Sequence, residues 1–177
     1  MLTVKQQVKE LKKSLRRNLM EEFTFNPEIW KGLEETRNCF TYALNIHDGK
    51  IDKNIVGDYE KIAGKSLGKD VTVDEVYDIA VETLKKLRLD FKECQFETEV
   101  PSGHFKVAWY VSHHDIHWLR QDSDGTWSHK QGWYRSPTNI DENGNLILNP
   151  STAKIKLSIG DYLLDIRYFL ISKKYQG

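Results

Sequence analysis

The chain has 177 residues with 26 basic and 26 acidic side chains, so its formal net charge is zero. The length suggests one domain, and the even charge excludes a general nucleic-acid binder, which would be strongly basic. The sequence lacks both a membrane-spanning apolar run of about 20 residues and an apolar signal segment, which predicts a cytoplasmic protein, with release by a non-Sec route left open.

An amphipathic helix is predicted within residues 1–25. Its apolar stripe recurs at helical spacing, and basic side chains occupy the other faces. The stripe consists of Val4, Val8, Leu11, Leu15 and Leu19. We expect an appendage that docks on a main domain at residues 26–177 and keeps its basic face in solvent. The alternative is a partner or an anionic surface bound at residues 4–19.

Three further helices are predicted before residue 90. One begins at Asn38, a favourable N-cap residue, and runs to about residue 46. Residues 47–70 have weak periodicity, and we expect one short helix there at 58–63. The best-marked helix follows Thr72, because Thr72 and Glu75 form a capping box ahead of an apolar helical pattern.

Strand patterns dominate the rest of the chain. Five strands are expected, at residues 91–96, 104–111, 115–121, 126–130 and 162–172. The polar run 139–145 marks a surface loop with a turn at 141–144. Helices therefore come first and strands follow, which predicts an α+β fold with N-terminal helices packed on an antiparallel sheet.

The two cysteines, Cys39 and Cys94, are too few for a disulfide scaffold or a four-cysteine zinc site. Cys39 follows Asn38 at a predicted helix start, where unpaired N–H groups and the helix dipole favour a thiolate. We therefore expect a lowered thiol pKa and a nucleophile suited to acyl transfer. The alternative for Cys39 is simple packing, which we expect for Cys94.

Four of the six histidines lie between residues 113 and 129, around the hairpin signal Asp124-Gly125. A three-residue loop with Gly125 in the left-handed conformation would place His117 and His129 on one face of the hairpin. A two-residue loop would place them on opposite faces. Two histidines on one face can act as a base and the group that orients it.

A metal site is the rival use of this region, since His113, His114, Asp115 and His117 are all metal-ligand types. In a strand, however, His114 would point away from His113 and His117. No established metal-binding spacing accompanies these residues. The sequence therefore predicts no metal.

Tryptophans surround the histidines, and we expect cross-strand packing from them, with some rings walling a substrate cleft. They are Trp109, Trp118, Trp127 and Trp133. Basic residues between the rings would also suit single-stranded nucleic acid. Asp115, Asp122 and Asp124 would repel its phosphates, so we do not predict such binding.

The segment Asn38-Cys39-Phe40-Thr41-Tyr42-Ala43 resembles the nucleophile motif of CHAP and NlpC-type cysteine hydrolases. In NlpC-type members a His that begins a strand follows the Cys, and a second polar residue, often His, comes about a dozen positions later. His117 and His129 match this order. Residues 115–130 also resemble a signature of uncharacterised bacterial proteins, Asp-Tyr-His-Trp-Tyr-Arg-Gln-Asp followed by Gly-x-Trp-Ser-His-Lys-Pro-Gly, with Gln131 in place of the Pro.

The resemblance covers about residues 37–171 and implies a papain-like fold of bacterial or phage type. It implies a cysteine hydrolase or acyl transferase that acts on a peptide, amide or isopeptide bond of a peptide or protein, without a cofactor. A binding or effector module that keeps the fold without the chemistry is the alternative. A metal-dependent hydrolase built on residues 113–117 is the third hypothesis.

The expected site follows from these roles. Cys39 is the nucleophile, His117 is the base, and His129 orients His117, with Asp122 as the fallback for that orienting role. The candidate substrate-binding residues are Asn38, Tyr42, Trp118 and Trp127.

Overall fold

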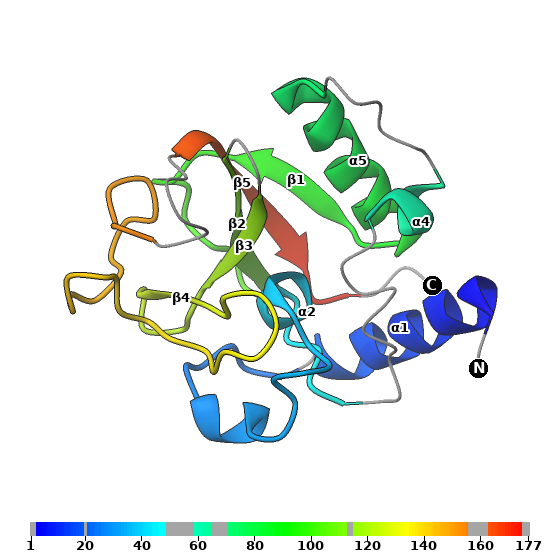
Figure 1. The fold of residues 1–177 in the computed structure, drawn as a ribbon, viewed down its shortest axis with the longest axis horizontal. Coiled ribbons are helices and arrows are strands. Elements are labelled where there is room, and N and C mark those ends of the chain that lie inside the picture. Colours follow the sequence, from blue (N-terminus) through cyan, green and yellow to red (C-terminus); the bar gives the residue numbers. More distant parts are fainter. Residues whose placement is uncertain are drawn as a thin grey trace.

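A five-stranded antiparallel sheet lies at the centre of the molecule (Figure 1), in the order β1-β5-β2-β3-β4. The computed structural model describes residues 3–19, 21–48, 59–64, 71–112, 115–155 and 163–174. The strands are β1 Phe91–Cys94, β2 His104–Ser112, β3 Ile116–Gln121, β4 Trp127–His129 and β5 Leu163–Ser172. All five predicted strands are confirmed, with ends that differ by at most two residues, and the fold class is α+β.

The described helices are α1 Val4–Asn18, a short 3-10 helix Pro27–Trp30, α2 Cys39–Ala43, α4 Tyr59–Ala63 and α5 Val73–Lys86. The predicted caps are present: Asn38 accepts the Thr41 N–H, and Thr72 and Glu75 form a capping box. α2 is shorter than expected because Asn45 takes a left-handed backbone conformation, with φ 55°. None of the described helices is long and apolar enough to cross a membrane.

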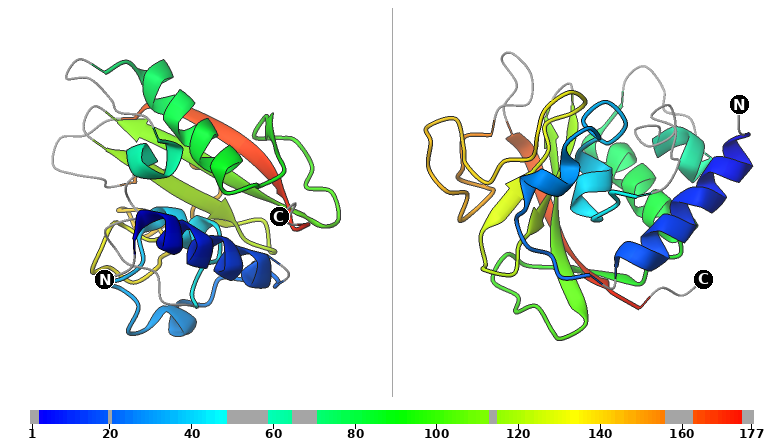
Figure 2. Two further views of the ribbon diagram at one scale, coloured as in Figure 1. Left: turned by 90° about the vertical axis from the view of Figure 1, so that its right-hand side faces the viewer. Right: turned by 90° about the horizontal axis from the view of Figure 1, so that it is seen from below.

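The sheet separates two apolar clusters. The helices cover one face, where Trp109, Trp118 and Phe169 pack against them. The loop after β4 covers the other face through Ile147 and Ile155. Figure 2 shows this arrangement in its right-hand view, with the helices on one side of the strands and the yellow and orange loop on the other. The strands that carry His117 and His129 thus lie between a layer of helices and a layer formed by the loop after β4.

Helix α1 is part of the main core. Leu11, Leu15 and Leu19 are fully buried in the cluster that also holds Cys39 and Trp118. The basic residues of α1 remain mostly exposed, as expected for a docked amphipathic helix. The apolar stripe of α1 therefore docks on the rest of the chain, as expected.

Replacing Leu15 with Ala should lower the free energy of unfolding by about 2–5 kcal/mol, because a fully buried leucine leaves a cavity. Urea denaturation measures this difference. The exposed Lys9→Ala variant on the same helix is the control and should change stability by less than about 0.5 kcal/mol. Equal stability of Leu15→Ala and the wild type would contradict the docking of α1.

Candidate active site

The β3–β4 hairpin sets the position of both histidines. Its loop holds three residues: the Asp122 N–H donates to the Thr126 carbonyl oxygen at 2.8 Å, and Gly125 has φ 88°. The cross-strand pairs Leu119–His129 and Gln121–Trp127 follow from this loop. The three-residue prediction is confirmed, and the two-residue alternative is wrong.

His117 and His129 are hydrogen-bonded to each other. His117 Nε2 lies 2.8 Å from His129 Nδ1, and the two rings are nearly perpendicular at 86°. Only 2% of His117 and 4% of His129 is exposed. One of the two bonded nitrogens carries the shared proton, so the bond fixes both ring orientations. It also leaves the Nδ1 atom of His117 outside the pair.

Both imidazoles are held in the neutral form. Burial lowers the pKa of His129 to about 4. Burial also lowers the pKa of His117 well below its usual range, and the neighbouring His129 lowers it further. A neutral imidazole can accept a proton, but lowered pKa values make the pair a weak base near neutral pH.

Acid should destabilise the protein through this pair. Because the folded-state pKa values lie below the unfolded value, unfolded chains bind more protons between about pH 4 and 6.5, and stability is lost as the pH falls through that window. For His129 the loss should approach about 3 kcal/mol near pH 4. Urea titrations from pH 7.5 to 4.5 should show this slope, and a His117→Asn/His129→Asn double variant should flatten it. An equal slope in both proteins would contradict the neutral buried pair.

Cys39 is the first residue of α2 and is buried, with 6% exposed. Burial raises its thiol pKa to about 11, although a bond from the Trp118 backbone N–H opposes that rise. The expectation of a lowered pKa is therefore wrong, because desolvation of the thiolate outweighs the field of a five-residue helix. The thiol is protonated at neutral pH.

The sulfur of Cys39 lies against the backbone of β3 between Ile116 and Trp118. Its Sγ atom is 4.0 Å from the carbonyl oxygen of Ile116. α2 packs on the face of β3 that carries Trp118, whereas His117 belongs to the other face by strand alternation. Within the described part of the chain no hydrogen bond joins Cys39 to either imidazole. The structure thus brings the two histidines together and places the thiol on the opposite face of their strand.

Asp122 belongs to a different cluster. Its Oδ1 accepts a hydrogen bond from Arg120 Nε at 3.0 Å, and both side chains are buried. Arg120 also donates to the Asn45 Oδ1 at 2.7 Å and lies over the Tyr42 ring. Because residues 117 and 122 point to opposite faces of the hairpin, Asp122 is not placed to orient His117. The structural role of Arg120 was not predicted from the sequence. A basic residue within an otherwise apolar strand pattern could have indicated a buried ion pair.

The four expected substrate-binding side chains are buried. Asn38 caps α2, and the Tyr42 hydroxyl bonds Ser128 Oγ at 2.7 Å. Trp118 packs edge-on against Phe40. Trp127 belongs to the second apolar cluster, on the loop side of the sheet. In this structure these side chains support the site and do not wall a cleft.

Two further sequence predictions concern Cys94 and the alternative metal ligands. Cys94 is a half-buried free thiol in β1, as its packing role predicts. His113 and His114 lie outside the described residues. Among the residues that are described, no three His, Cys, Asp or Glu side chains gather where they would hold a metal ion.

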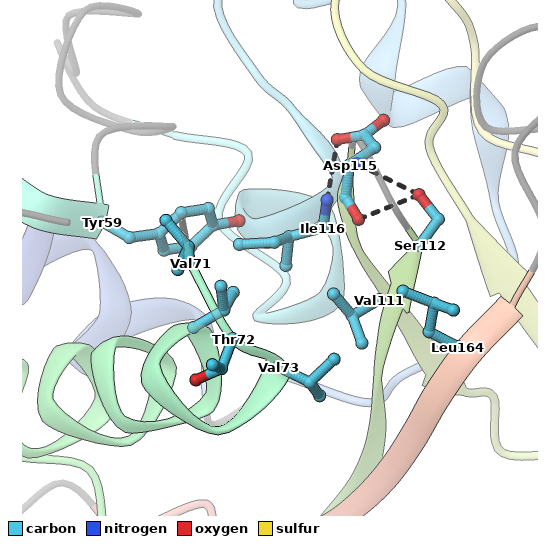
Figure 3. A pocket seen from close by; sticks show the side chains of 10 residues that line it. Tyr59, Val71, Thr72, Val73, Val111, Ser112, Asp115, Ile116 and Leu164 are labelled. Carbon is cyan, nitrogen blue, oxygen red and sulfur yellow. Dashed lines mark hydrogen bonds between the residues drawn. The ribbon is translucent and has the colours of Figure 1, made fainter. Parts of the chain in front are cut away.

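A cavity of about 440 Å³ lies on the helical side of the sheet, and Tyr59 and Ile116 line it (Figure 3). Three of its lining residues also interact with Cys39, which does not itself line the cavity: Tyr59, Asp115 and Ile116. The buried Tyr59 hydroxyl lies between Cys39 and Trp118 and interacts with both. This cavity was not predicted, since its walls come from four separate segments of the chain.

No protein-family model matches the chain, and no solved structure matches it. The chain is 30% identical over 134 residues to insoluble matrix shell protein 1 of Ruditapes philippinarum. The alignment covers 73% of this chain and 79% of that protein.

Proposed function

The chain belongs to the same family as insoluble matrix shell protein 1, whose name states a location and not a reaction, and we propose its function from its own site. It is a cysteine hydrolase or acyl transferase with papain-like architecture. It acts on a peptide, amide or isopeptide bond of a peptide or protein. Cys39 is the nucleophile, His117 the general base and His129 the residue that positions His117.

The observation that carries the proposal is the buried His117–His129 hydrogen bond, on the strand whose backbone the sulfur of Cys39 contacts from the opposite face. A neutral imidazole pair with one member fixed by the other is the arrangement a base needs. The chain order of cysteine, first histidine and second histidine also matches that of NlpC-type hydrolases. Burial of these groups excludes water, which strengthens charge interactions during the reaction.

The chemistry proceeds through a thioester. Cys39 and His117 lie on opposite faces of β3 in this structure, so the reaction requires a rearrangement that brings them to one face. Cys39 Sγ then attacks the carbonyl carbon of the substrate and passes its proton to His117 Nδ1. The resulting imidazolium is stabilised through Nε2 by His129. The C–N bond breaks as the leaving amine takes that proton, and water or a second amine then releases the acyl group from sulfur. Because the resting thiol is protonated, proton transfer accompanies the attack.

A binding module without catalysis is the second candidate. Two observations favour it: the thiol is buried with a raised pKa, and the relative is named for an insoluble matrix. In that case Cys39 packs the start of α2, and the histidine pair only stabilises the hairpin. The protein would then act through its surface, as a component of an assembly.

Alkylation of Cys39 by iodoacetamide separates the two candidates. With a pKa of about 11 and no base, only about one thiol in 10⁴ is ionised at pH 7. If His117 accepts the proton, Cys39 should label at least about tenfold faster than Cys94 at pH 7. A His117→Asn variant should abolish that advantage, as read by peptide mass spectrometry. If the alkylation rate of Cys39 rises only above pH 9 and is the same in the wild type and the His117→Asn variant, the binding module is favoured.

A further inference from the structure

The basic face of α1 and Arg88, the second residue after α5, line a groove with a volume of about 710 Å³. Six basic residues and one valine form the lining: Lys5, Lys9, Lys12, Lys13, Arg16, Arg88 and Val8. Among the described residues no carboxylate lines the groove. The groove is therefore a concave surface of a single charge, in a chain whose net charge is zero.

The positive charges of the groove are not neutralised within the described part of the chain. None of the six basic side chains makes an ion pair or a hydrogen bond with a residue that the structure describes. Burial lowers the pKa of Lys12, and the charges of Arg88 and Lys86 lower it further. The cations thus lie close enough to repel one another, and an anion bound in the groove would relieve that repulsion.

Arg88 occupies a backbone position that favours glycine. Its φ is 58°, in the left-handed region, and the Leu89 N–H donates to the Leu84 carbonyl oxygen at 3.1 Å to close the end of α5. A cation near a helix C-terminus interacts favourably with the helix dipole, but the last turn of α5 already contains Lys85 and Lys86. A strained position is thus occupied by a residue whose side chain adds one more positive charge to the groove.

Two classes of anionic partner fit this groove poorly. The apolar stripe of α1 is buried in the protein's own core, so α1 has no continuous apolar face left to enter a bilayer. No aromatic ring lines the groove among the described residues, so the bases of a single-stranded nucleic acid would have no ring to stack on. A polyanion without bases fits better.

The spacing of the lysines suits an extended acidic peptide. Lys5, Lys9 and Lys13 are four residues apart on α1, so they follow one another at about 6 Å along the helix axis. Alternate side chains of an extended chain point to the same side at a separation of about 6.6 Å. Val8 and the aliphatic stems of the lysines offer apolar contact to the residues in between. Acidic side chains at every second position can therefore each reach one lysine.

We propose that this groove binds an extended acidic segment of a partner protein, with Asp or Glu at alternate positions facing the basic side chains of α1 and Arg88. The binding site is independent of the reaction proposed for Cys39. A partner held here would leave both faces of the sheet unchanged, because the groove lies on the outer side of α1.

Fluorescence anisotropy with labelled peptides tests the groove in the full-length protein. A peptide of six Glu-Ser repeats should bind, and a Gln-Ser peptide of the same length should not. A peptide of six Glu-Ser-Ser repeats has the same charge at a wider spacing and should bind at least about fivefold more weakly. Raising NaCl from about 50 to 500 mM should weaken binding of the Glu-Ser peptide at least about tenfold, because salt screens exposed charges. Absence of binding at 50 mM NaCl, or equal affinity for the two spacings, would overturn the proposal.

A matched pair of double variants locates the site. Lys9→Gln/Lys13→Gln removes two charges from the groove and should weaken binding of the Glu-Ser peptide at least about fivefold. Lys31→Gln/Lys92→Gln removes two exposed charges elsewhere and should change the affinity less than about twofold. Urea denaturation should give both variants the wild-type unfolding midpoint, since all four lysines lie at the surface. Equal affinities of the two variants would overturn the assignment to this groove.

Competition by other polyanions tests the class of partner. An oligouridylate, a heparin oligosaccharide and phosphatidylserine vesicles should each need at least about fivefold more charge than unlabelled Glu-Ser peptide to displace the labelled peptide. Displacement by one of them at an equal or lower concentration of charge would assign the groove to that class and overturn the acidic peptide.

Discussion

A Cys39→Ala variant should lose at least about 10⁴-fold of its turnover of activated acyl esters, because it removes the sulfur that carries the proposed thioester. The methyl side chain fits the space of the buried thiol, so the unfolding transition should stay close to that of the wild type. Steady-state kinetics with a p-nitrophenyl ester and urea denaturation measure the two effects. The Cys94→Ala variant is the control and should retain full turnover.

The two histidines should differ in the same assay. His117→Asn should lower turnover by about 10²–10⁴-fold, as expected for loss of a general base. His129→Asn should lower it less and shift the pH profile of kcat, because His129 acts through His117. Equal activity of the wild type and the Cys39→Ala variant would show that any esterase activity arises elsewhere.

Replacing Arg120 with Ala should give the largest loss of stability, about 3–5 kcal/mol, because it leaves the buried Asp122 carboxylate without its partner. The same change removes the Arg120 hydrogen bonds to Asn45 and to the carbonyl oxygen of Thr24. Arg120 thus joins β3 to the segments on both sides of α2. Urea denaturation monitored by tryptophan fluorescence should show the shift.

Two controls separate the loss of the Arg120–Asp122 ion pair from the loss of Arg120 packing. The exposed Arg135→Ala variant should change stability by less than about 0.5 kcal/mol. An Arg120→Met/Asp122→Leu double variant should be more stable than Arg120→Met alone, because it removes the unpaired carboxylate. If the double variant is the less stable of the two, the Arg120–Asp122 pair is not the source of the loss.

Local sequence signals predicted much of the structure. Asp124-Gly125 gave the hairpin register, which alone decided that His117 and His129 share a face. Cap residues likewise placed the starts of α2 and α5. These signals succeed because turns and caps depend on a few adjacent residues, whose conformational preferences are nearly independent of the rest of the fold.

The predictions that were wrong, and the features that were not predicted, depend on contacts between distant segments of the chain. The raised pKa of Cys39 results from its burial beneath α4 and β3, and no residue close to Cys39 in the sequence indicates that these segments cover it. Tyr42, Trp118 and Trp127 resemble cleft residues in sequence, yet each is buried by packing across the sheet. Local sequence patterns also do not predict that β5 lies between β1 and β2, since strand order reflects competition among all strands.

The central position of β5 also governs how the chain must be assembled during synthesis. β5 pairs with β1 on one side and with β2 on the other, yet it follows both in the chain. Until the ribosome has released residues 163–172, β1 and β2 each present an open edge of the kind that recruits other chains. The β2–β3–β4 hairpins can form early, but closure of the sheet waits for the last strand. Chaperone protection of these two edges would therefore matter more for this protein than for one with sequential strand order.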